Sequence, residues 1–191
     1  MLLVLQGALA ACGSGAAPLP RTAYGPEGMA VQEGVLLAPA AATGRPVDGL
    51  ACGPPHVAFH IHAHLAVYVD GALRPIPAGI GMVDPKPTNT RTGPLLEHPK
   101  CYYPLHVHAQ DGVIHAEGTE PQAYTLGEFF DIWGQPLSLS RVGPYRGRVS
   151  VFVDGSPGVG DPRKLVLAPK QVITLVVGQG VTPAPVDWSH F

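Results

Sequence analysis

Residues 59–69 read FHIHAHLAVYV, and their side chains alternate strictly between two kinds. Successive side chains of a β-strand point to opposite faces, so this alternation predicts a half-buried strand. One face carries only apolar side chains, from Phe59, Ile61, Ala63, Leu65, Val67 and Val69. The other face begins with three imidazoles, His60, His62 and His64. The segment therefore predicts a strand that presents histidines on the face opposite the core.

A second group of histidines follows about forty residues later. It consists of LHVH at residues 105–108 and VIHAE at residues 113–117. Six of the nine histidines of the chain thus fall within two short windows. We hypothesise that the two windows meet in space and hold a transition-metal ion.

The second window suggests a hairpin geometry. Asp111-Gly112 is a favoured two-residue hairpin turn. With the turn at that dipeptide, His108 would lie opposite His115, and His106 opposite Glu117. Directly opposed residues share a sheet face. This register therefore predicts one polar patch made of all four side chains.

Composition limits the possible classes of protein. The chain has 191 residues, of which 46% are hydrophobic and 14% charged, enough for one domain with a real core. The net charge is −2 and no basic run is present, which argues against a nucleic-acid partner. The 24 glycines and 22 prolines favour short strands and loops over long helices.

Residues 1–11 are predicted to form a signal peptide. An uncharged apolar run ends in Leu9-Ala10-Ala11-Cys12. This pattern resembles the lipobox of bacterial lipoproteins, in which the signal is cleaved before a cysteine that then carries lipid. The resemblance implies lipidation of Cys12 and a membrane partner at the bacterial cell envelope. The run is too short for a transmembrane helix, which needs about 20 residues. A buried N-terminal strand is the alternative.

The other two cysteines are expected to pair. Cys52 and Cys101 remain as an even pair, and an oxidising compartment favours a disulfide between them. Each precedes a histidine window by a few residues, so the bond would link the starts of two histidine-bearing strands. The alternative is that one of them is a thiolate metal ligand.

Three further segments complete the expected organisation. Residues 12–46 are rich in Ala, Gly and Pro and are predicted to be a flexible tether, whereas residues 181–191 are predicted to be an extended tail. The histidine-rich β domain is expected at residues 47–180. Within it, residues 79–100 show little periodicity and are predicted to be a long functional loop that covers the site.

One helix is well signalled. Thr125 is an N-cap candidate, with Glu128 three residues later as its capping-box partner. A single apolar stripe follows, made of Leu126, Phe129, Phe130 and Trp133. Residues 149–153 and 171–177 predict further strands, and Asp-Gly pairs follow residues 69 and 153 as hairpin turns. The expected fold is α+β and mostly β, either a β-grasp-like domain or a small β-sandwich, with one short helix packed on the sheet.

Strand geometry limits how many histidines can share an ion. Residues two apart along a strand are separated by about 6.6 Å, so His60 and His64 would lie about 13 Å apart. We therefore expect two ligands from the first window and one or two from His106, His108 and His115. The remaining histidines would support the ligands or form a second site. Imidazoles suit Cu(II) and Zn(II), and three methionines are too few for a Met-rich Cu(I) carrier.

The role of Glu117 stays open, and so does the question of whether the histidines bind any ligand. Glu117 would shift the choice of metal towards iron or manganese if it were a ligand, or it would orient a ligating ring or act as a general base. The sheet could also present its histidines to solvent without any ligand, in a structural or interaction module.

Several strings of this sequence resemble an uncharacterised family of exported, histidine-rich bacterial proteins. They are HIHAHL at 60–65, CYYPLHVH at 101–108, VIH at 113–115 and LGEFFDIWG at 126–134. The resemblance spans about residues 50–178 and implies a single exported domain, but no activity. A cupin is disfavoured, because its His-x-His motif is followed within a few residues by a glutamate, whereas Glu117 lies nine residues after His108.

The sequence thus favours an extracytoplasmic, lipid-anchored metal-binding protein that handles copper or zinc. The alternative is a metalloenzyme whose three-histidine centre leaves one position for an activated water, with Glu117 moving protons.

Overall fold

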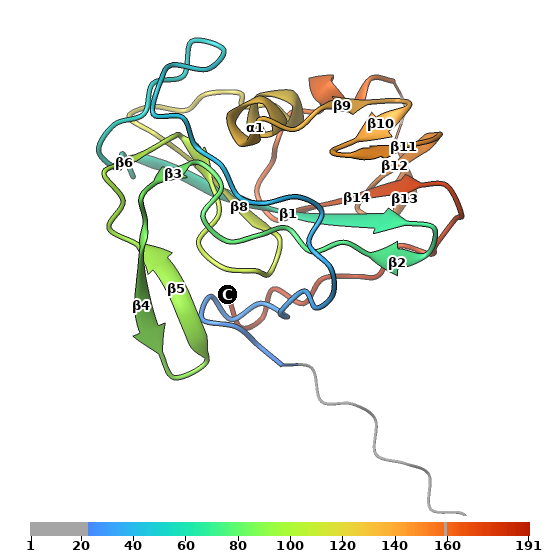
Figure 1. Ribbon diagram of the computed structural model, residues 1–191, viewed down its shortest axis with the longest axis horizontal. Coiled ribbons are helices and arrows are strands. Elements are labelled where there is room, and N and C mark those ends of the chain that lie inside the picture. Colours follow the sequence, from blue (N-terminus) through green and yellow to red (C-terminus); the bar gives the residue numbers. More distant parts are fainter. Residues whose placement is uncertain (1–22, 159) are drawn as a thin grey trace, which may run out of the picture.

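A seven-stranded mixed sheet forms the centre of the computed structural model, which describes residues 23–158 and 160–191 (Figure 1). The strands lie in the order β13-β12-β14-β1-β8-β7, and β2 pairs with the end of β1. They are β1 (Phe59–Val69), β2 (Ala72–Leu73), β7 (Leu105–His106), β8 (Val113–Gly118), β12 (Val149–Val153), β13 (Ser156–Pro157) and β14 (Gln171–Val177). The expected α+β, mostly β fold is confirmed.

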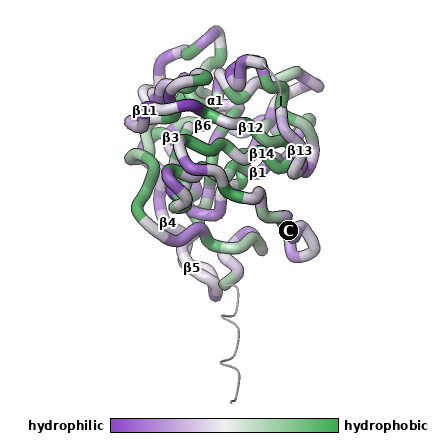
Figure 2. The backbone as a smooth tube through the Cα atoms, turned by 90° about the vertical axis from the view of Figure 1, so that its right-hand side faces the viewer, coloured by the Kyte–Doolittle hydropathy of each residue, from purple (hydrophilic) through white to green (hydrophobic). Residues whose placement is uncertain are grey.

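Strand β1 is the central strand. It pairs in parallel with β14 from Ala63 onwards and antiparallel with β8 over its first half. Its apolar face is buried from the third alternate position onwards, with Leu65 and Val67 fully covered. Figure 2 shows apolar segments gathered in the middle of the molecule, around β12 and β14. The strict alternation in the sequence therefore predicted both the strand and its buried face correctly.

Two Asp-Gly turns close the expected hairpins. Asp70 and Gly71 join β1 to β2 with φ angles of 49° and 83°, and Asp154 and Gly155 join β12 to β13 in the same conformation. Positive φ at both central residues is the mark of a type I′ turn, which matches the right-handed twist of the strands.

Helix α1 (Leu126–Trp133) covers one face of the sheet (Figure 1). It begins with the predicted capping box, in which Glu128 N donates to Thr125 Oγ1 and Thr125 N donates to Glu128 Oε2. Gly134 ends it in the left-handed conformation. Phe129, Phe130 and Trp133 are fully buried, which is what the apolar stripe requires of a helix packed on a sheet.

Short strands outside the main sheet occupy the connections. They are β9 (Leu137–Ser138), β10 (Arg141–Val142), β11 (Tyr145–Arg146), β3 (Met82–Val83), β6 (Cys101–Tyr102), β4 (Lys86–Thr90) and β5 (Gly93–Glu97), with one 3-10 turn, η1 (Pro162–Lys164). The expectation of a loop without secondary structure at 79–100 was wrong, because β4 and β5 pair antiparallel there. The hairpin does reach the histidines, as described below.

The folded domain also begins earlier than residue 47. Met29 and Leu37 are buried, and the amide of Gln32 bridges the backbones of Leu65 and Ile76. Composition suggested a tether because the segment has few large apolar residues. Met29 and Leu37 are nevertheless buried, although Val31, Val35 and Leu36 are exposed, and hydrogen bonds to strand backbones hold the segment in place.

The expected signal peptide and the lipidation site Cys12 lie outside the described residues. Among the residues that are described, no helix combines the length and apolarity needed to cross a bilayer.

The predicted register of the second hairpin was wrong by two residues. His106 pairs with His115, whereas Glu117 pairs with His60 on the other side of β8. Six residues, 107–112, join β7 to β8 in place of a two-residue turn. Because side chains alternate with a period of two, a shift of two residues leaves every side chain on the face that was predicted.

Candidate metal site

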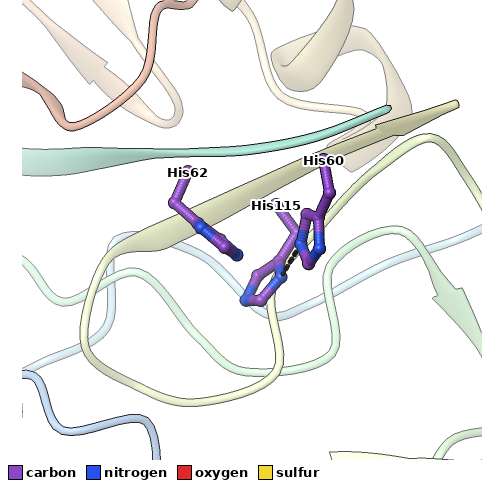
Figure 3. Close-up of side chains that lie close together, drawn as sticks. All are labelled: His60, His62 and His115. Carbon is purple, nitrogen blue, oxygen red and sulfur yellow. Dashed lines mark hydrogen bonds between the residues drawn. The ribbon is translucent and has the colours of Figure 1, made fainter. Parts of the chain in front are cut away.

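Three adjacent strands bring the two histidine windows together. His62 on β1 lies opposite His115 on β8, and His115 lies opposite His106 on β7. Two residues along the same strands, His60 on β1 lies opposite Glu117 on β8. Figure 3 shows the rings of His60, His62 and His115 extending from their strands to the same side of the sheet. The convergence predicted from the sequence is therefore confirmed.

The first set of potential ligands, which we call the outer group, consists of His60, His62 and His115. His60 Nε2 lies 3.1 Å from His115 Nδ1, the contact drawn in Figure 3. The ring of His62 is centred 4.3 Å from that of His60 and 4.5 Å from that of His115. His60 has 32% of its side chain exposed, so this group opens to solvent.

The second set, which we call the inner group, consists of His106, His108 and His115. His106 Nε2 and His108 Nε2 are 3.1 Å apart. The ring of His115 is centred 4.6 Å from that of His108 and 5.3 Å from that of His106. His106 is 1% exposed and His115 6%, so this group is buried.

The backbone determines which ring nitrogens are available in the inner group. His106 Nδ1 lies 2.9 Å from the carbonyl oxygen of Tyr103, and His108 Nδ1 lies 2.6 Å from that of Leu96 on β5. A carbonyl oxygen only accepts, so both Nδ1 atoms carry the proton and donate. Each neutral ring is then left with a lone pair on Nε2, and the two lone pairs face each other. Two acceptors at this distance must share either a proton or a metal cation.

Glu27, which the sequence analysis did not identify, places its carboxylate beside His115 of the inner group. His115 Nε2 donates to Glu27 Oε1 over 2.7 Å. Glu27 lies 88 residues before His115, within the segment expected to be a tether. Gln32 holds that segment in place through reciprocal hydrogen bonds with Gln110. No local pattern in the sequence could have indicated this contact.

Glu117 lies between the two groups. Its Oε1 is 3.3 Å from His60 Nε2 and 3.7 Å from His106 Nε2. Glu117 also lines a cavity of about 270 Å³ together with Tyr102 and Tyr124. The residue named from the sequence as a possible ligand or proton carrier therefore sits where either role is possible.

Burial keeps the imidazoles unprotonated. It lowers the pKa of His62 to about 3, and it holds the pKa values of His106 and His115 well below that of a free imidazole. The pKa of His60 is also lowered by burial. Burial raises the pKa of Glu27 and that of Glu117 to about 7. At neutral pH these four rings thus offer lone pairs rather than N–H⁺ groups, as metal ligation requires.

His64 belongs to neither group, which corrects its inclusion among the candidate ligands. It faces the same side of β1 as His62 but lies two residues further along the strand, opposite Val113 on β8. It lines a separate cavity of about 330 Å³ with Tyr68 and Thr174. Its Nδ1 has no hydrogen-bond partner, and burial lowers its pKa to about 4. The strand spacing had already indicated that His60 and His64 cannot share an ion.

The C-terminal segment contacts the outer group at Phe191. The ring of Phe191 is centred 4.4 Å from that of His62. Tyr24 donates a hydrogen bond to Asp187 and packs against His190, so residues from both ends of the described chain lie side by side (Figure 1). His190 itself remains exposed and outside both groups.

The expected disulfide between Cys52 and Cys101 is present. Next to it, Gly53 and Tyr102 exchange backbone hydrogen bonds. The bond therefore fixes the chain just before Tyr103, whose carbonyl oxygen orients His106. It also excludes both cysteines as thiolate ligands.

Comparison of the chain with protein-family models, curated proteins and solved structures gives no match.

Proposed function

We propose that this chain binds a divalent transition-metal ion, zinc or copper, through its histidine cluster. The observation that carries the proposal is the 3.1 Å approach of two Nε2 lone pairs, from His106 and His108. Backbone carbonyls fix both rings in this tautomer. With Zn–N bonds of about 2.0–2.1 Å, two tetrahedral ligands lie about 3.3 Å apart. The site thus needs only a small adjustment to hold an ion.

The donor set supports the choice of metal. Imidazole nitrogens predominate in both groups, and both cysteines of the described region are in a disulfide. Imidazole-rich sets without thiolates suit Zn(II) and Cu(II). The hydrogen bonds from Nδ1 to carbonyl oxygens are the outer contacts that metal-ligating histidines commonly make.

The proposed setting is the bacterial cell envelope. The disulfide supports an oxidising compartment outside the cytoplasm. A lipid on Cys12 would attach the protein to the membrane, as the lipobox-like end of the apolar run implies. The protein would then handle copper or zinc close to the membrane surface.

Metal analysis of the protein tests this function. The protein is purified without chelator or His tag, loaded with Zn(II), dialysed and analysed by mass spectrometry. The double variant His62→Ala/His108→Ala removes one partly exposed ligand from each group, and we expect its metal content to fall at least tenfold. The variant His56→Ala, which changes an exposed histidine outside both groups, is the matched control. Equal metal content in all three proteins would contradict the proposal.

A metalloenzyme is a second candidate, favoured by the position of Glu117 at a cavity beside the ligands. A catalytic site keeps one coordination position open. Titration of the Co(II)-substituted protein with azide separates the two functions. A change in the visible spectrum that saturates with azide would support an open position, whereas an unchanged spectrum would indicate a filled shell and a binding role.

A further inference from the structure

We propose that the cluster holds two metal ions, and that the ring of His115 bridges them. The inference rests on the proposed metal binding and adds the number of ions and their connection. Two glutamates and six ring nitrogens form two sets of donors, and the two sets share the ring of His115.

The two nitrogens of His115 face different partners. Its Nδ1 lies 3.1 Å from His60 Nε2, in the outer group. Its Nε2 lies 2.7 Å from Glu27 Oε1, on the inner side. His115 is the one residue shared by both groups of potential ligands among the described residues. A single imidazole nitrogen cannot serve both groups, whereas the two nitrogens of one ring can.

Each group then has four donors. The outer set is His60, His62, His115 Nδ1 and Glu117, whose Oε1 lies 3.3 Å from His60 Nε2. The inner set is His106, His108 and His115, with Glu27 Oε1 at 2.7 Å from His115 Nε2, and we assign that nitrogen to the inner ion. Three imidazoles and one carboxylate complete a tetrahedral shell in each case. One four-coordinate ion would use four of these eight donors and leave the other four unligated.

Binding of the second ion changes the protonation of His115. Its Nε2 hydrogen, now donated to Glu27, leaves as a proton to solvent, and the nitrogen lone pair forms the bond to the metal. Glu27 exchanges its hydrogen bond for a bond to the same ion. The two atoms, now 2.7 Å apart, would have to separate to about 3.3 Å to occupy neighbouring positions on one tetrahedral ion.

The two sites differ in exposure. His60 has 32% of its side chain exposed, whereas His106 has 1%. The outer ion should therefore exchange faster with chelators in solution than the inner one. Removal of metal by a chelator in one fast and one slow phase would therefore also indicate two ions.

Titration with Cu(II), followed by electron paramagnetic resonance, tests the proposal. We expect two equivalents of Cu(II) per chain. The spectrum should show a simple signal at one equivalent and loss of that signal through spin coupling at two, because an imidazolate bridge couples the two ions. The variant His62→Ala should retain one equivalent in the inner site, and Glu27→Gln should retain one in the outer site, both without coupling.

Other results of this titration would overturn the bridge, the second site or the metal binding itself. Two equivalents without coupling would overturn the bridge. One equivalent in the unmodified protein would overturn the second site while leaving the proposed function intact. No bound Cu(II) or Zn(II) in the unmodified protein would overturn both. The variant Glu33→Gln removes an exposed carboxylate in the same segment as Glu27 and should behave as the unmodified protein does.

Discussion

At the scale of single residues, Asp111 is a buried carboxyl group with an incomplete set of partners. It is 0% exposed, its Oδ1 accepts from Val113 N, and its Oδ2 has no hydrogen-bond partner. Burial, followed by the charge of Glu27, raises its pKa to about 7. Its ordinary pKa is near 3.8, so folding favours the protonated form.

This shift makes the contribution of Asp111 to stability depend on pH. The contribution is fully present below pH 3.8 and is lost as the pH rises through about 7, because the folded state binds the proton more tightly than the unfolded state. We expect Asp111→Asn to gain stability relative to the unmodified protein by on the order of 2 kcal/mol between pH 5 and pH 8. Urea unfolding at several pH values measures this difference.

The control for this prediction is Glu33→Gln, which removes an exposed carboxylate. Its stability relative to the unmodified protein should stay nearly constant over the same range. A difference for Asp111→Asn that does not change with pH would show that the carboxyl titrates at its ordinary pKa.

At the scale of elements, the connection between β7 and β8 holds the N-terminal segment against the sheet. Gly112 has a φ angle of +83°, and a Cβ there would lie 2.2 Å from Gln32 Nε2 and 2.4 Å from the carbonyl oxygen of Leu65. Gly112 also accepts a hydrogen bond from Leu65 N. This connection thus links β1, the inner histidines and the segment that carries Glu27.

Two glycines with the same backbone angle allow a matched test. Gly71 also has φ +83°, but a Cβ there meets nothing within 4 Å. We expect Gly71→Ala to cost about 1 kcal/mol from backbone strain alone. Gly112→Ala should cost several kcal/mol, because it adds a collision with backbone to the same strain. Chemical denaturation of both variants measures the costs, and equal values would contradict the close approach.

At the scale of the whole molecule, the candidate metal ligands come from segments far apart in the sequence. The disulfide between Cys52 and Cys101 closes a loop of 49 residues that contains β1 and ends just before β7. It joins the two regions that carry most of the histidines. The cross-link therefore restricts the unfolded chain as well as positioning the ligands.

Removal of this disulfide should be costly. Loop-closure entropy for a loop of this length predicts a loss of about 4 kcal/mol. We expect the double variant Cys52→Ala/Cys101→Ala to lose that amount of unfolding free energy, and so to unfold at a lower urea concentration, and to bind metal more weakly. Reduction of the unmodified protein should reproduce the effect, and a protein equally stable with and without reductant would contradict it.

The sequence alone determined those features that depend on local periodicity and local capping. The alternation over residues 59–69 predicted β1, its buried face and the common face of its histidines. Thr125 and Glu128 predicted the start of the helix. Even the register error in the second hairpin preserved the common face, because side chains repeat with a period of two.

Only the tertiary structure decided which donors meet. His64 shares the face of His62 but lies one row away from the other ligands, and strand pairing sets that row. Glu27 reaches His115 across 88 residues because Gln32 hydrogen-bonds to backbone groups of β1 and its neighbours. Contacts between distant segments depend on how separate elements pack, and local patterns in a single sequence carry no signal for that packing.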